Sequence, residues 1–456
     1  MQRSSSRLEN DTMSTTTLHH TPNSPPVYRL PTEILAVIFV LLKEHHYTPA
    51  SFALTVSRVC KSWRSIAHGT GKLWNTIFID DDEDGRHLMA YMDACSTLSG
   101  LYGLDVTCYS KVYLPRVIAK LLPHAHRWEY LELTGHWCDF LSLSTLSPSC
   151  PRLRKVSLAS DPREDLVHVT GILDFTRDSI VQLEHLSVDA SCASRVEGVI
   201  NIPPFTNLRH LDISLGDAWH CPSALLRAAL LSRLTIDFLA TDCCRPDGTW
   251  AELDALEPFH MPALYKLCLC NASHVLMRYI VAPALEELLL TCPTSARGLP
   301  DGDYCTSLLA LVSAGDAPHP LLDFAAQDIP EDFDDAAARA LPRALERLGN
   351  LEELSVYCTG GADRPVMSRA VISALVCREG APPLVPNLTK FCISPNYGCF
   401  PPDVMIEHML LLQDVLFSRA VPRVIEGTPV VALESAQVPE IQYMGPAHDQ
   451  DDRNDG

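Results

Sequence analysis

Apolar residues recur along the middle of the chain in a short pattern, Leu-x-x-Leu-x-Leu/Ile/Val. Its second and third apolar positions stand two residues apart, which matches alternate side chains of a β-strand and breaks the periodicity of a helix face. We therefore expect one strand from each copy of the pattern. The copies begin at Leu101, Trp128, Leu153, Leu183, Leu208, Leu231, Leu264, Leu285, Leu351 and Leu388, with a possible first member at Trp74.

The spacing of these copies indicates a repeat array. Most begin 21 to 30 residues after the previous copy, close to the about 20–29 residues of leucine-rich repeats. A gap of 66 residues between Leu285 and Leu351 has room for two copies. It shows only a weak one at Pro320–Phe324, or else an acidic insertion around Asp328–Asp335. The Asn ladder of regular leucine-rich repeats is missing, so we predict an α/β fold with an irregular leucine-rich-repeat solenoid (horseshoe).

Residues 28–77 carry a helical pattern instead. Pro31 suits the first turn of a helix, and the apolar residues that follow it at positions 34, 35, 38, 39 and 42 form one face. A second apolar piece at Phe52–Leu54, and three- and four-residue steps from Val56 to Ala67, predict a further helix with one apolar face. We expect a three-helix module. Because so small a block buries little of its own surface, its apolar faces dock either on the repeat array or on another protein.

Composition and charge narrow the class of protein. An apolar content of 47% indicates a folded chain, and a net charge of -20 argues against nucleic acid and anionic membranes as partners. The longest apolar run, Ile34–Leu42, is far shorter than the roughly 20 residues that span a bilayer. The first residues have no apolar core of a secretory signal, and seventeen cysteines are best read as reduced thiols. We expect an intracellular protein of the cytoplasm, the nucleus or both.

These observations divide the chain into four parts. Residues 1–27 are polar and rich in Ser and Thr, which predicts a disordered leader. The helical module takes residues 28–77 and the repeat array residues 78–424. Residues 425–456 end in an acidic run and are expected to form a flexible tail.

One segment, Gly69-Thr70-Gly71-Lys72, looks like the end of a phosphate-binding loop. Such a loop needs a Gly five residues before the Gly-Lys pair, a Ser or Thr after the Lys, and a preceding strand. Here the first position is Ile66, the residue after Lys72 is Leu73, and the preceding segment is helical. The glycines are expected to end that helix instead.

Metal and catalytic sites are also not expected. The residues that invite a metal-site interpretation form no paired Cys-x-x-Cys set and lack a further ligand of suitable spacing; they are Cys243, Cys244, Cys268, Cys270, His274, His124 and His126. No nucleophile, general base and Gly-rich cofactor turn occur together. The sequence therefore predicts a protein that is not an enzyme and needs no cofactor and no metal.

The helical module resembles a known family. Leu30-Pro-x-Glu-Ile-Leu-x-x-Ile38-Phe-x-x-Leu42, then Val59-Cys-x-x-Trp63 and Leu73-Trp74, is similar to the F-box motif. The whole chain most resembles the F-box-like proteins of mushroom-forming fungi, which carry degenerate leucine-rich repeats after the box. Its loop before the second helix departs from the family's frequent Asp-Leu step.

This resemblance implies a function. In the family, the box docks on the Skp-type adaptor, and through it on the cullin, of an SCF-type ubiquitin ligase, while the repeats bind a protein substrate. The chain would then be the ligase's substrate-recognition subunit. The alternative is an interaction protein that binds the adaptor or another partner without directing ubiquitination. Carried over, the adaptor contacts are Leu30, Pro31, Ile34, Leu35, Ile38, Phe39, Val59, Cys60 and Trp63.

The repeats also predict a candidate substrate face. If the second and third apolar positions of each copy point inward, the residue just before the second points outward. In five consecutive copies this residue is Lys155, His185, His210, Arg233 and Lys266. Such a column would attract an acidic or phosphorylated segment, although charged residues are also what solvated positions ordinarily carry.

Overall fold

The computed structural model describes residues 30–45, 49–81, 85–136, 139–140, 143, 150–160, 170–174, 182–190, 197–201, 207–215, 233–238, 258–291, 303–314, 318–327, 335–357, 369–394 and 402–437. The predicted leader, residues 1–27, and most of the predicted tail lie outside these ranges. The chain divides into two compact units. The helical unit takes residues up to Thr76 together with Ala94–Tyr102, and the sheet unit takes Ile77–Asp93 and the residues from Gly103 onward.

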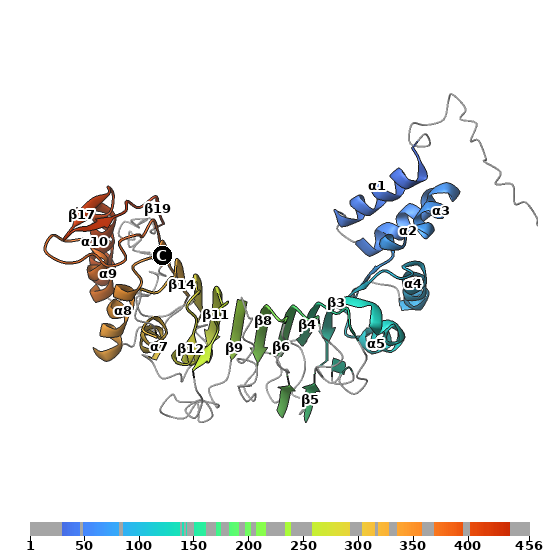
Figure 1. Cartoon of the computed structure of the whole chain (residues 1–456), viewed down its shortest axis with the longest axis horizontal. Helices are drawn as coiled ribbons and strands as arrows, with labels where there is room; N and C mark the ends of the chain where they lie inside the picture. Colours follow the sequence, from blue (N-terminus) through green and yellow to red (C-terminus); the bar gives the residue numbers. More distant parts are fainter. Residues whose placement is uncertain are drawn as a thin grey trace, which may run out of the picture. The chain divides into compact units, whose positions relative to one another are not determined.

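The helical unit contains α1 (Thr32–Glu44), α2 (Pro49–Val59), α3 (Lys61–Gly69) and the short 3-10 helix η2 (Gly71–Leu73) (Figure 1). Each of the three α-helices packs against the other two. The last residues of α4 (Gly85–Leu98) belong to the same unit. The Phe39 ring of α1 lies 4.8 Å from the Trp63 ring of α3 between ring centroids. The predicted three-helix module is present.

The single helix expected from Val56 to Ala67 is wrong, because the chain breaks at Cys60. That residue is extended, with φ -159° and ψ 172°, and its Sγ accepts a hydrogen bond from the Trp63 main-chain N–H at 3.4 Å. The cysteine thereby caps α3 and satisfies one of the N–H groups that a helix start leaves without a partner. Two helices, α2 and α3, result where the apolar spacing predicted one.

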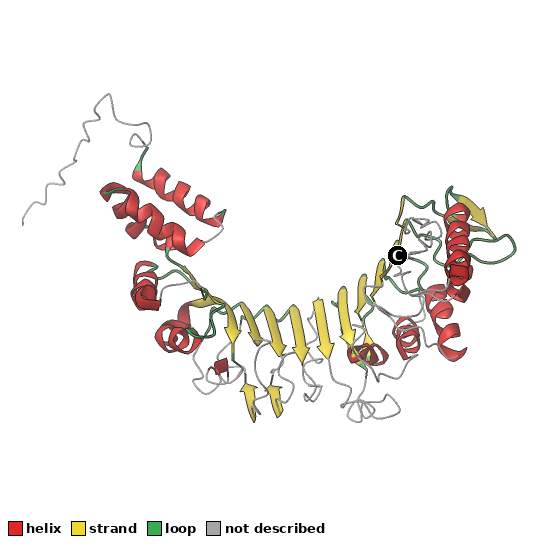
Figure 2. Cartoon of the chain, turned by 180° about the vertical axis from the view of Figure 1, so that it is seen from behind, coloured by secondary structure: helices red, strands yellow, loops and turns green. Residues whose placement is uncertain are grey.

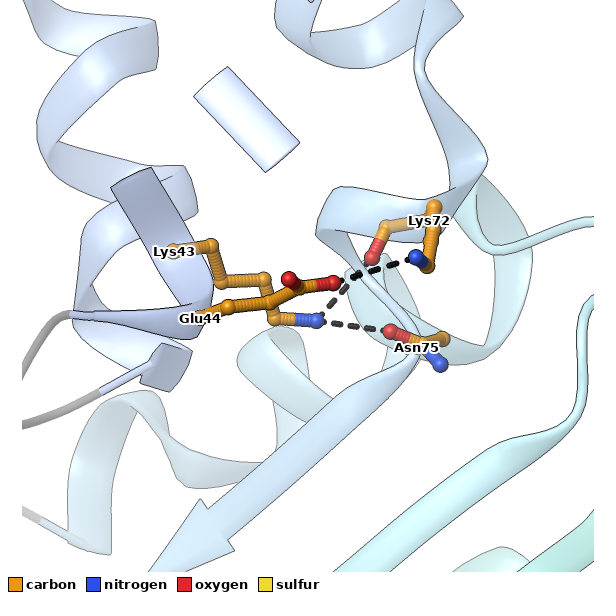
Figure 3. Close-up of polar contacts among 4 residues, drawn as sticks. All are labelled: Lys43, Glu44, Lys72 and Asn75. Carbon is orange, nitrogen blue, oxygen red and sulfur yellow. Dashed lines mark hydrogen bonds and ion pairs between the residues drawn. The ribbon is translucent and has the colours of Figure 1, made fainter. Parts of the chain in front are cut away.

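The segment after α3 follows a helix and not the strand that a phosphate-binding loop needs. Its polar contacts with the end of α1 are drawn in Figure 3. Helix α3 ends at Gly69 as predicted, and Trp74 Nε1 donates a hydrogen bond to the Ala67 carbonyl at 2.8 Å. Lys72 Nζ faces Glu44 at 3.1 Å, with both side chains about half exposed. The buried Lys43 ammonium donates to the Lys72 carbonyl at 2.9 Å and to Asn75 Oδ1 at 2.6 Å. These contacts fasten the end of α1 to the segment.

The sheet unit is built around a thirteen-stranded sheet, counted over the described residues (Figure 2). Every neighbouring pair from β2 to β19 is parallel. In spatial order the strands are β1 (Thr76–Ile79), β2 (Leu104–Cys108), β3 (Trp128–Gly135), β4 (Lys155–Ser160), β6 (His185–Ala190), β8 (His210–Leu215), β9 (Arg233–Phe238), β11 (Lys266–Asn271), β13 (Glu287–Thr291), β14 (Asp323–Gln327), β15 (Glu353–Tyr357), β16 (Lys390–Ser394) and β19 (Ser435–Gln437).

Each copy of the sequence pattern forms one of these strands, which confirms that part of the expectation. Side chains alternate between buried and partly exposed along the strands, for example in β4 and β13. The second apolar position is buried in every copy; the buried residues are Leu104, Leu131, Val156, Leu186, Leu211, Leu234, Leu267, Leu288, Leu354 and Phe391. The possible first member is also a strand, with Ile77 and Ile79 buried.

Two strands of the large sheet, β14 and β19, were not clear from the sequence pattern. The weak copy at Pro320–Phe324 leads into β14, where Phe324 and Ala326 are buried. Of the proposed acidic insertion, residues 328–334 lie outside the described residues, and α8 begins at Asp335. Strand β19 lies within the part of the chain predicted as a tail, as does the second strand of a hairpin formed by β17 (Arg423–Ile425) and β18 (Thr428–Val430).

Helices and short strands connect the strands of the large sheet. They are α5 (Leu114–Leu121), η3 (Leu122–Arg127), η5 (Ala272–Arg278), α7 (Asp303–Val312), α8 (Asp335–Arg347), α9 (Arg369–Leu375) and α10 (Pro402–Ser418), with the parallel pairs β5 (Thr170–Asp174)–β7 (Glu197–Asn201) and β10 (Phe259–His260)–β12 (Ile280–Val281). η5 packs against β9, β11 and α7, and α7 to α10 pack in sequence. No helix among the described residues is long and apolar enough to cross a bilayer.

A buried arginine holds the last helices of the sheet unit together. The Arg419 side chain is fully buried and follows directly after α10. Its guanidinium donates hydrogen bonds to the carbonyls of Leu375, Leu384 and Val385, at 3.2, 2.5 and 3.1 Å. Leu375 is the last residue of α9, and Leu384 and Val385 lie in the segment before β16. One side chain therefore joins the end of α10 to the end of α9 and to this segment.

Candidate functional site

Helix α1 carries a broad apolar face, of which only one edge is buried. Leu35 and Phe39 are buried in the helical unit, with exposed fractions of 5% and 1%. The rest of this face leaves apolar side chains about half exposed: Ile34 is 48% exposed, Leu41 52% and Leu42 50%. A surface helix ordinarily turns charged and polar residues to water, so this exposed apolar face marks an interaction surface.

The nine predicted adaptor contacts differ in exposure. Leu30, Pro31, Ile34 and Val59 are exposed, whereas Ile38, Cys60 and Trp63 are half-buried and Leu35 and Phe39 are buried. The apolar face predicted for α1 is therefore only partly exposed, because Leu35 and Phe39 are buried within the helical unit. Whether each of the nine residues contacts a partner stays a prediction.

Sequence reasoning missed two exposed apolar residues of α1, Val37 and Leu41. Val37 is 56% exposed, and both lie at helical spacing from Ile34, on its side of the helix. Their apolar character was visible in the run from Ile34 to Leu42. The sequence lacked only the information on which side of α1 the other helices pack. We call Ile34, Val37, Leu41 and Leu42 the α1 outer face.

The predicted column on the sheet is present. Strand register places Lys155 beside His185, His185 beside His210, His210 beside Arg233, and Arg233 beside Lys266. Each lies in the first outward position of its strand, next to a buried leucine or valine. We call these five residues the basic row. Tyr130 continues it on one side and Glu287 on the other.

Two cations of the basic row are held by aromatic rings. Lys155 Nζ lies 4.6 Å from the centroid of the Tyr130 ring, and the Arg233 guanidinium carbon lies 5.9 Å from that of the Tyr265 ring. Both distances fall within the range of a cation–π contact. Such a contact attracts the cation but does not cancel its positive charge. Lys266 differs, because its Nζ lies 2.5 Å from Glu287 Oε2 and forms an ion pair.

The two histidines between them are neutral at pH 7. Their rings meet edge to face, with centroids 5.3 Å apart and an interplanar angle of 69°. Burial, with Lys155, His210 and Arg233 adding positive charge nearby, lowers the pKa of His185 to about 4. Burial and nearby Arg233 also lower the pKa of His210. The fixed charge of the row therefore comes from Lys155 and Arg233, and not from five side chains as the sequence suggested.

Beyond the basic row, the same register turns acidic. Asp323 and Glu353 follow Glu287 on the next strands, and Lys390 pairs with Glu353 at 3.0 Å. Burial, with the neighbouring negative charge of Glu353 and Glu287, raises the pKa of Asp323. The outward face therefore changes sign between β11 and β13.

Several cysteines behave as small apolar side chains. Burial raises the pKa of Cys108 and Cys150 to about 11 and that of Cys305 to about 12, so their thiols stay protonated at pH 7. The Cys268 and Cys270 sulfurs lie 4.0 Å apart on β11. The described residues contain no group of three or more His, Cys, Asp or Glu side chains placed to hold a metal ion.

The remaining residues considered for metal chemistry lie apart. His274 stacks on the Tyr304 ring with centroids 3.7 Å apart. His124 and His126 both lie on η3, where burial and the charge of nearby Arg127 lower the pKa of His124. The cysteines at 243 and 244 lie outside the described residues.

The helical unit has the character of a protein-interaction domain, and comparison with known proteins matches it to a family. Its exposed apolar helix face is typical of a domain that acts by protein–protein contact. Residues 27–80 match the F-box-like family, a range that contains α1, α2, α3, η2 and β1. F-box-like domains generally bind Skp-type adaptors. A search of curated proteins gives no match to the chain.

Proposed function

We propose that this protein is the substrate-recognition subunit of an SCF-type ubiquitin ligase. The F-box-like domain docks on the Skp-type adaptor and through it on the cullin, and the sheet unit binds a protein substrate. The chain itself has no catalytic role in this proposal, and it works in the cytoplasm, the nucleus or both.

The observation that carries the proposal is the position of the α1 outer face within the residues that match the F-box-like family. Its four apolar side chains are each about half exposed. Covering the exposed half of such a side chain contributes roughly 1 kcal/mol, so the four together supply roughly 4 kcal/mol toward binding. Leu30 and Val59, which are 39% and 56% exposed, add apolar area in the same domain.

The sheet unit supports the second half of the proposal. Its strands come from a repeated pattern, run parallel and sit at neighbouring positions in one sheet. We propose that they are degenerate leucine-rich repeats in an irregular solenoid (horseshoe), as in the F-box-like proteins of fungi that the sequence resembles. Such arrays present one residue from each repeat in a row, which suits recognition of an extended protein segment.

A second function is favoured by the same exposed face. The chain binds the adaptor, or another protein, through the α1 outer face without directing ubiquitination. The two functions share the docking step and the helical unit that performs it, and they differ only in whether a docked substrate is ubiquitinated.

Co-purification from cells tests docking. The tagged full chain is expected to bring down a Skp-type adaptor and a cullin, and Ile34→Asp or Leu42→Asp is expected to remove both. Val112→Asp is the matched control, because Val112 is an exposed apolar residue of the sheet unit, at 68%. Retention of the adaptor by both α1 variants would refute the proposed interface.

A second measurement separates the two functions. Proximity labelling with and without proteasome inhibition is expected to reveal proteins that accumulate beside the wild-type chain and not beside Ile34→Asp. If the adaptor is labelled and no protein accumulates or is ubiquitinated in a chain-dependent way, the non-degradative alternative holds.

A further inference from the structure

The basic row contains two fixed charges separated by a neutral gap. Lys155 stands on β4 and Arg233 on β9, and the strand order β4-β6-β8-β9 places three strand spacings between them. Neighbouring strands lie about 4.8 Å apart, so the two positions are roughly 14 Å apart across the sheet. His185 and His210 fill the gap.

Neither charge is neutralised within the described residues, where the close partners of Lys155 and Arg233 are the aromatic rings of Tyr130 and Tyr265. Lys266 and Lys390, in the same register, are each paired with a glutamate. The row therefore has two cations, Lys155 and Arg233, that can accept an anionic partner. Lys266 and Lys390 already have an anionic partner, in each case a glutamate.

Acidic side chains on the same strands restrict where an anionic partner lies. Asp212 stands two residues beyond His210 on β8, and Asp189 four residues beyond His185 on β6. Both are partly exposed on the outward side of the sheet. Because these positions carry carboxylates, the cations of this part of the outward face are confined to the row itself.

We infer that the basic row binds an extended acidic segment of a partner protein, which presents carboxylate side chains four residues apart to Lys155 and Arg233. An extended chain advances about 3.4 Å per residue, so about 14 Å corresponds to four residues. Residues four apart also point to the same side of an extended segment. The inference rests on the proposed function, since it names the class of substrate that the sheet unit receives.

Carboxylates fit this row better than phosphates do. Phosphorylated segments are ordinarily recognised by clustered arginines that surround one phosphate. Here one lysine and one arginine stand three strands apart, so each meets one singly charged group. The neutral imidazoles between them suit uncharged residues in the intervening part of the segment.

Fluorescence anisotropy with the purified full chain tests the inference. The probe is a labelled, unstructured peptide with two glutamates four residues apart in a background of Ser, Gly and Ala. Its comparison peptides carry glutamine at both positions, the two glutamates side by side, or phosphoserine at both positions. Binding is expected for the spaced pair, to be at least about tenfold weaker for the adjacent pair and the glutamine peptide, and to weaken as salt is raised.

Variants of the chain assign the contacts. Lys155→Gln and Arg233→Gln are each expected to weaken binding about tenfold, and the double variant to abolish it. Lys390→Gln is the matched control, since Lys390 lies in the same register but pairs with Glu353, and it is expected to change binding less than about twofold. Unchanged thermal unfolding of each variant shows that the sheet unit is intact.

Three results would overturn the inference: no binding of the spaced peptide, equal binding of the spaced and adjacent pairs, or binding of the phosphoserine peptide alone. Co-purification of the adaptor is measured on the same preparations and depends on the helical unit. Adaptor binding without peptide binding would therefore contradict this inference while leaving the proposed docking function in place.

Discussion

Replacement of Lys43 by methionine is expected to weaken the contact, within the helical unit, between the end of α1 and the segment from Lys72 to Asn75. The residue is 6% exposed, and its ammonium donates to the Lys72 carbonyl at 2.9 Å and to Asn75 Oδ1 at 2.6 Å (Figure 3). Methionine keeps an unbranched apolar stem of similar length and removes the charge. The change therefore tests these bonds with little alteration of packing.

The size of the effect depends on two opposing contributions. Hydrogen bonds from a charged group contribute about 1.5–3 kcal/mol each, so the loss of two would destabilise the unit by roughly 3–6 kcal/mol. Removal of the buried ammonium also relieves its desolvation, which offsets a large part of that loss. We expect a net destabilisation of about 2 kcal/mol, which corresponds to a roughly thirtyfold increase in local opening.

Hydrogen–deuterium exchange in peptides that cover α1 and η2 measures this opening directly. Lys72→Ala is the control in the same segment. It removes only an exposed ion pair with Glu44, which contributes about 0–1 kcal/mol. Equal exchange in Lys43→Met and Lys72→Ala would show that the buried ammonium does not stabilise the contact between α1 and the segment that follows α3.

Three further expected results concern the buried and exposed parts of the apolar face of α1, the buried arginine and a histidine of the basic row. Leu35→Ala is expected to destabilise the helical unit by about 2–4 kcal/mol in urea unfolding, whereas Ile34→Ala changes it by less than about 0.5 kcal/mol; equal losses would mean that α1 is turned differently. Arg419→Met is expected to leave three carbonyls, two of them in buried bonds, without their donor and cost about 3–5 kcal/mol, measured as a lower thermal unfolding temperature of the sheet unit; an unchanged transition would contradict this. The pKa of His185, lowered to about 4 in the fold, lies below its ordinary value, so the unfolded chain binds the proton more readily. Stability is therefore expected to fall as pH drops from about 6.5 toward 4, less steeply in His185→Gln, and an NMR titration midpoint of His185 near 6.5 would refute the shift.

The strands of the sheet unit could be predicted from the sequence because period-two alternation is local. A buried residue at each second position, such as Leu267 or Leu288, was enough to locate the strand and to set its register against its neighbours. The same alternation placed the outward residues of the basic row correctly. Strand β14 gave only a weak signal because Ala326 stands where the other copies have a larger apolar residue. In β19, Ala436 occupies the inward register beside Phe391 and leaves almost no apolar pattern.

The site was less predictable, because its character depends on contacts between elements. The break at Cys60 arises from a sulfur that caps α3, which the apolar spacing does not record. Which face of α1 is covered depends on where α2 and α3 pack, so Leu35 and Ile34 looked equivalent in the sequence. The charge of the basic row depends on burial and neighbours, which make His185 neutral and pair Lys266 with Glu287.

Docking of the α1 outer face on a Skp-type adaptor underlies the proposed function, and a binding titration of the two purified proteins measures it without other components. Isothermal titration of the full chain with the adaptor is expected to show saturable binding with one adaptor per chain. Ile34→Asp is expected to weaken it at least about a hundredfold, since it places a charge in an apolar interface, and Val112→Asp to leave it unchanged. Absence of binding by the wild-type chain, or equal affinity of Ile34→Asp and the wild type, would contradict docking through this face.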